Sequence, residues 1–172
     1  MVMPDRKRRR PSNSGSWACV IVLSVFLGLI LGTILAFFAD ISYPALMRVA
    51  LEEHVSIVML LASLLLPISL CVIAVLLSAS WLLPVICFAR CLSFSFVSMC
   101  MFLAFDGIGW FLRWLLMFGH IASLPILIWF CLKHRKGNAK GLMLTLISCV
   151  SVLALAGSVD YSISILLRQL RL

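Results

Sequence analysis

Charged residues are scarce in this sequence. Its 172 residues include only six Asp and Glu and 14 Lys and Arg, whereas 64% of the residues are hydrophobic. A soluble domain of this length covers its surface with charge, which commonly takes up about a quarter of its residues. A water-soluble globular fold is therefore excluded. Continuous apolar runs without strict alternation predict an all-α bundle of transmembrane helices and not a barrel.

The chain also lacks the sequence motifs of common enzymes. It contains no GxSxG, HExxH or P-loop motif and no pair of carboxylates on one helix that could act as acid and base. Its seven cysteines lie within or beside apolar runs, without a CxxC pair. Cysteines in such positions are typical of small apolar packing residues. We therefore predict a protein that is not an enzyme and has no metal, no cofactor and no structural disulfide.

Apolar runs divide the chain into a basic tail, residues 1–16, and a membrane domain, residues 17–172. The first run has 23 uncharged residues, or about 34 Å of helix, which is enough to cross a hydrocarbon core of about 30 Å. An amphipathic segment, residues 40–54, is expected on the outer surface. The composition predicts about five spans, at residues 17–39, 55–79, 85–105, 110–132 and 141–167.

Two basic clusters indicate the topology. Arg6–Arg10 precede the first expected span, and Lys133–Lys140 separate the last two. The positive-inside rule places both clusters in the cytoplasm, where anionic lipid head groups attract them, and leaves the C-terminus outside. A sixth span, made by dividing the fourth at Gly119 and His120, would move the second cluster outside and is disfavoured. This placement of charge indicates the lipid bilayer of the cell membrane as a partner, and not nucleic acid.

Small residues and prolines predict details of the first three spans. Gly28 and Gly32 form a GxxxG step, which permits close approach of another helix, although glycines are also tolerated in a lipid-facing helix. Pro67 is expected to kink the second span. The uncharged segment Trp81–Pro84 predicts a tight return at the inner interface, followed by a third span from about residue 85.

Four ionisable side chains are expected at membrane depth, where their cost makes each a candidate functional group: Arg90, Arg113, His120 and Asp160. We expect Arg90 to extend to the inner head groups. His120 could relay protons or bind a ligand, but a neutral imidazole bonded to a Ser or a carbonyl is favoured.

Arg113 and Asp160 lie at similar depth in the last two expected spans, about 10 Å from the outer surface. Because the loop between these spans is short, they are expected to be antiparallel neighbours. We predict an ion pair between the two side chains, since pairing lowers the cost of burying each charge. The alternative is that Arg113 extends outward and Asp160 is protonated or meets a Ser.

The segment Leu83–Leu132 resembles the core of the stage II sporulation protein M family. The resemblance is carried by Pro84, Phe88-Ala89-Arg90, Ser93-Phe94-Ser95-Phe96, Gly109 and Leu124-Pro125. The first span, with its Phe26–Gly32 glycine pattern after a basic tail, is also similar. The resemblance implies a non-enzymatic bacterial membrane scaffold that works with cell-wall hydrolases during sporulation, and it brings no catalytic residues.

Two functions follow from these observations. The first is a multi-pass membrane scaffold that holds other membrane or cell-wall proteins together. The second is a small membrane subunit of a transporter that binds a solute within the bundle, lined by Arg113, His120 and Asp160. A scaffold is expected to pack without a sizeable cavity, whereas a binding subunit needs a pocket of some hundreds of Å³ lined by several polar groups.

Overall fold

The computed structural model describes residues 14–39, 57–104, 111, 117–134 and 141–169. These residues form five α-helices and no strand: α1 Ser14–Phe38, α3 Ile57–Leu76, α4 Leu82–Ala104, α6 Phe118–Lys133 and α7 Leu142–Gln169. The expected outer segment, residues 40–54, lies outside the described residues. The all-α prediction is thus confirmed for the described part of the chain.

Three of the described helices are long and apolar enough to cross a membrane. They contain the candidate spans Gly15–Phe38, Leu82–Leu103 and Leu142–Leu166. At the second and fourth expected spans the structure has shorter apolar stretches, Leu60–Leu76 and Phe118–Lys133. The described residues therefore support three candidate spans and not the five that composition predicted. Helix α6 has 16 residues, or about 24 Å, and begins eight residues later than expected.

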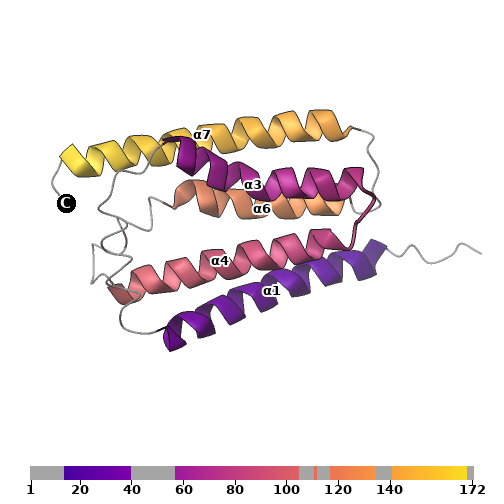
Figure 1. Cartoon of the computed structure of the whole chain (residues 1–172), viewed down its shortest axis with the longest axis horizontal. Coiled ribbons are helices and arrows are strands. Elements are labelled where there is room, and N and C mark those ends of the chain that lie inside the picture. Colours follow the sequence, from indigo (N-terminus) through magenta and orange to yellow (C-terminus); the bar gives the residue numbers. More distant parts are fainter. Residues whose placement is uncertain (1–13, 40–56, 105–110, 112–116, 135–140, 170–172) are drawn as a thin grey trace, which may run out of the picture.

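The helices lie side by side with their axes roughly aligned (Figure 1). Helices α1 and α4 run in the same direction, while α3 and α6 run the opposite way. The start of α1, the turn from α3 to α4, the end of α6 and the start of α7 all lie at one end of the bundle. Both basic clusters are therefore attached to helix ends on the same side.

The return between α3 and α4 lies earlier than predicted. Helix α3 ends at Leu76 and α4 begins at Leu82, so Pro84 is in the first helical turn, where a missing amide costs no hydrogen bond. Ser78 has a left-handed backbone with φ 55°. The amide of Ala79 donates to the carbonyl of Ala74 at 2.8 Å, and that of Ser78 to Val75 at 3.0 Å. These two bonds form a Schellman cap that ends α3.

The buried core lies where α3, α4, α6 and α7 meet. Its fully buried side chains are mostly aliphatic, aromatic or thiol groups, such as Ile68, Leu83, Phe130 and Leu153. Large apolar side chains also cover the outside of the bundle, for example Phe38, 84% exposed, and Leu144, 70% exposed. An apolar exterior of this kind suits a hydrocarbon solvent and not water.

Candidate functional site

The structure places Gly28 and Gly32 at the contact between α1 and α4. A Cβ atom at Gly28 would lie 2.6 Å from the carbonyl oxygen of Phe88 and 3.0 Å from Cys91 Cβ. A Cβ atom at Gly32 would overlap the carbonyl oxygen of Leu92. Both positions therefore need glycine, because the atoms in the way belong mainly to the backbone of α4. Gly28 and Gly32 are four residues apart, and so are Phe88 and Leu92, whose carbonyl oxygens they approach. This matched spacing is expected where two parallel helices pack closely.

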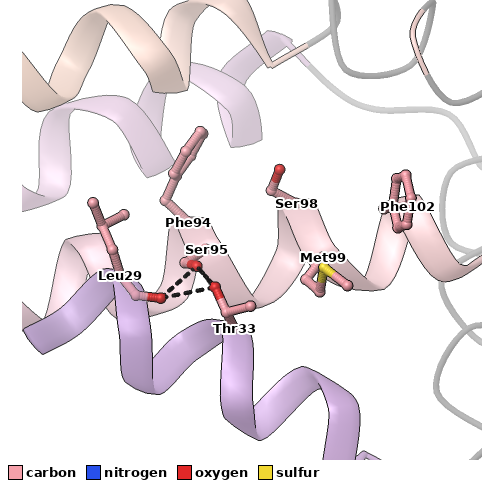
Figure 2. A pocket seen from close by; sticks show the side chains of 7 residues that line it. All are labelled: Leu29, Thr33, Phe94, Ser95, Ser98, Met99 and Phe102. Carbon is pink, nitrogen blue, oxygen red and sulfur yellow. Dashed lines mark hydrogen bonds between the residues drawn. The ribbon is translucent and has the colours of Figure 1, made fainter. Parts of the chain in front are cut away.

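Hydroxyl groups strengthen this seam beside the glycines (Figure 2). Ser95 Oγ donates to the carbonyl oxygen of Leu29 at 2.7 Å, and Thr33 Oγ1 contacts the same oxygen at 2.9 Å. The two hydroxyl oxygens are themselves 2.7 Å apart. Two of these three contacts join α1 to α4, and the contact between Thr33 and Leu29 lies within α1. Sequence reasoning missed both hydroxyls because alternating serines in a helix point in several directions.

The seam predicts a large difference between two glycines of α1. Gly32→Ala should destabilise the protein by about 1–3 kcal/mol, because the new methyl group meets backbone that cannot move aside. Gly15→Ala should have little effect, since nothing lies within 4 Å of its Cβ position. Thermal unfolding in detergent checks both variants. Equal unfolding temperatures for the two variants would show that α1 and α4 are not in close contact.

A polar cluster of Arg90, His120 and Ser123 joins α4 to α6. Arg90 Nη2 lies 2.5 Å from His120 Nδ1 and donates to Ser123 Oγ at 3.1 Å. Ser123 Oγ in turn donates to the carbonyl oxygen of His120 at 2.6 Å. Because a guanidinium group can only donate, His120 Nδ1 must accept, which makes the imidazole neutral with its proton on Nε2.

The expected position of Arg90 at the inner head groups is wrong. The side chain starts eight residues into α4, about 12 Å from the helix end, and contacts α6 instead of extending to the surface. His120 and Ser123 of α6 supply two neutral acceptors for the guanidinium group. Sequence spacing does not reveal this, because the partner residues lie 30 or more positions away.

Asp160 of α7 holds the beginning of α6. Its Oδ2 atom accepts a hydrogen bond from the amide of Gly119 at 2.7 Å, and the side chain is 1% exposed. Helix α6 has no side-chain cap of its own at Met117. The carboxylate therefore satisfies an amide that has no partner within the helix, at the positive end of the helix dipole. A Cβ atom at Gly119 would lie 2.6 Å from Oδ2, so only glycine permits this approach.

The predicted ion pair between Arg113 and Asp160 is not tested, because Arg113 lies outside the described residues. The second carboxylate oxygen, Asp160 Oδ1, is buried and has no hydrogen-bond partner among the described residues. Of the three predicted polar residues, the structure thus brings His120 and Asp160 to the same helical turn. His120 belongs to this turn and faces Arg90 of α4, whereas Asp160 reaches the turn from α7.

Removing the carboxylate should weaken this junction measurably. Asp160→Ala is expected to cost about 1–3 kcal/mol, because the buried amide of Gly119 loses its acceptor. Asp160→Asn should destabilise the protein less than Asp160→Ala, because the amide oxygen of Asn still accepts a hydrogen bond. Some stability is still lost, because Asn has no negative charge to interact with the helix dipole. Ser158→Ala is the matched control, because that exposed hydroxyl bonds only to its own helix. An Asp160→Ala variant as thermally stable in detergent as Ser158→Ala would contradict the capping role.

Three thiols meet in the core between α3, α4 and α6. Cys131 Sγ lies 3.5 Å from Cys87 Sγ and 3.8 Å from Cys71 Sγ, and all three residues are fully buried. All seven cysteines are free thiols. In the described part of the chain, no group of three or more His, Cys, Asp or Glu side chains is arranged to hold a metal ion. The thiols act as small packing groups that let three helices approach.

No family model matches the chain, and no curated protein or solved structure is significantly similar to it. The resemblance to the stage II sporulation protein M family therefore stays a prediction that rests on the residues given above.

Proposed function

We propose that this protein is a non-enzymatic scaffold of the cell membrane. The observation that carries the proposal is how the polar groups inside the bundle are used. Arg90, His120 and Ser123 bond to one another, and Asp160 bonds to the helix end at Gly119. These bonds hold α4, α6 and α7 together, which gives the polar side chains at membrane depth a structural use.

We further propose that all five helices cross the bilayer, with the basic tail in the cytoplasm. Helix α3 has 20 residues, or about 30 Å, which matches the hydrocarbon core. Helix α6 is shorter, and its start within the bundle is supported by Asp160. At its other end Lys133 Nζ lies 4.7 Å from the centre of the Trp129 ring, an arrangement that suits a membrane–water interface. Both basic clusters adjoin helix ends at the same end of the bundle, which supports a cytoplasmic location for this end.

Labelling of single cysteines tests this topology. In a background without the native cysteines, Gly137→Cys and a cysteine at Ser12 should react only after a membrane-permeant reagent is added. Asp106→Cys should react with an impermeant reagent applied from outside, because an odd number of crossings separates it from the tail. Outside labelling at position 137 would contradict the five-crossing arrangement.

The partners that we propose are membrane or cell-wall-remodelling proteins. Helix α1 packs mainly on α4 and presents large apolar side chains on its opposite side, including Phe26, 59% exposed, and Phe37, 63% exposed. This surface can contact either lipid or another helix. The resemblance to a sporulation scaffold family supports the second use and names the class of partner.

The alternative, a solute-binding subunit of a transporter, is less well supported. Two cavities of about 280 and 360 Å³ lie between helices, but apolar side chains form most of their lining. His120 and Asp160 line neither cavity. A polar solute would therefore find few hydrogen-bonding partners in them.

Site-specific photo-crosslinking in native membranes separates the two functions. A photoreactive amino acid at Phe26 or Phe37 should capture the same cell-wall-remodelling protein, because both positions lie on the exposed face of α1. The same group at Ile21, which is fully buried, is the control and should capture nothing in common with them. Capture of a transport ATPase, or of lipid alone, would overturn the scaffold proposal.

A further inference from the structure

A cavity of about 360 Å³ lies between α3 and α4. Six of its nine lining residues are apolar, and the other three are one charged and two hydroxyl side chains. The lining consists of Ser63, Leu66, Pro67, Leu70, Val85, Ile86, Ala89, Arg90 and Ser93. Leu66, Leu70 and Val85 are 45–61% exposed, so the cavity opens to the lipid side of the bundle.

The polar side chains are at one end of this cavity. Leu70 and Val85 lie near the turn between α3 and α4, whereas Ser63 and Ser93 are farther from it along both helices. Arg90 lies close to Ser93 on α4, about 12 Å from the start of that helix. The cavity therefore has an apolar end near the α3–α4 turn and a polar end farther along both helices.

The positive charge of Arg90 is not paired with an anion among the described residues. Its Nη2 atom bonds to His120 and Ser123, but its Nε atom is buried and has no hydrogen-bond partner in the described part of the chain. Both groups that it contacts are neutral, and no carboxylate among the described residues pairs with it. A cation without a paired anion attracts one, because an uncompensated charge in a medium of low dielectric constant is costly.

We propose that this cavity binds a carboxylic acid with an apolar tail, such as a fatty acid. The carboxylate pairs with the positive charge of Arg90, whose side chain lines the cavity, and the tail lies along Leu66, Leu70 and Val85 toward the α3–α4 turn. The proposal does not depend on the scaffold function. The bound carboxylate pairs with the positive charge of Arg90, which the neutral partners His120 and Ser123 do not neutralise.

The chemistry of the cavity favours a carboxylic acid over a phospholipid. A carboxylic acid has a pKa near 4 to 5, so a fraction of it is neutral and can reach the depth of Arg90 before its proton returns to water. A phospholipid head group keeps its charge and stays at the membrane surface, above the depth of Arg90. A long-chain alcohol fits the apolar part but offers Arg90 no charge.

Photolabelling of the purified full-length protein with a diazirine-bearing decanoic acid tests the proposal. Labelled peptides should come from α3 and α4 around the cavity. Unlabelled decanoic acid should compete at least about tenfold better than decanol, which corresponds to about 1.4 kcal/mol. Phosphatidylglycerol should not compete. Equal competition by decanol, or effective competition by phosphatidylglycerol, would overturn the proposal.

Two variants locate the site. Ser93→Leu should fill the cavity and lower labelling at least about fivefold, equal to about 1 kcal/mol. Its fold should be unaffected, because the exposed Ser93 hydroxyl bonds only to the carbonyl of Ala89 in its own helix. Ser69→Leu is the matched control, since that exposed serine also bonds within its own helix and does not line the cavity. Equal labelling of the two variants would show that the fatty acid binds elsewhere.

Arg90→Gln tests the charge separately from the shape. Glutamine keeps an N–H donor for His120 but removes the positive charge, so decanoic acid should lose its advantage over decanol. An unchanged preference for the acid would exclude Arg90 as its partner. If this variant does not fold, Ser93→Leu still decides whether the cavity is the binding site.

Discussion

The first turn of α6 is the point on which the polar interior of this bundle depends. On one side the amide of Gly119 donates to Asp160 of α7, and on the other His120 accepts from Arg90 of α4. One charge of each sign is thereby held within two residues of the same helix. Because charged groups in the interior need hydrogen-bond partners, these bonds tie three helices to one another at this turn.

This junction also explains why α6 can begin inside the bundle. A helix end exposes amides without intrahelical partners, which the hydrocarbon core does not satisfy. Asp160 supplies the acceptor, and glycine at position 119 leaves room for it. The arrangement fixes the relative height of α6 and α7, because a shift of either helix would separate carboxylate and amide.

Helices α1 and α4 are held together differently. Gly28 and Gly32 bring the two backbones close, and Thr33 and Ser95 add hydroxyl contacts at the same level. Lipid chains are as apolar as the helix surfaces, so close packing and hydrogen bonds must provide the attraction. The bundle thus combines a seam of small residues with a charged junction, and α4 takes part in both.

Composition was sufficient to predict an all-helical membrane protein, because no water-soluble fold could cover so many apolar residues. The Gly28 and Gly32 spacing also indicated a position where a second helix could approach. The start of α6 was not predicted, although Gly119 and His120 offered a break in the fourth expected span, because the basic loop that follows disfavoured dividing that span. The direction of Arg90 depends on His120 and Ser123, whose proximity arises only from the packing of α4 on α6. The return before α4 was placed too late because Pro84 suits a first helical turn as well as a loop.

The protonation of His120 is the most direct measure of this junction. With His54 and His134 replaced by Gln, ¹⁵N NMR of the single remaining histidine in detergent reports which ring nitrogen carries a proton. The contact with Arg90 predicts a neutral ring, with Nε2 protonated and Nδ1 an acceptor. A proton on Nδ1, in either a neutral or a charged ring, would contradict the Arg90–His120 bond and with it the account of the α6 junction.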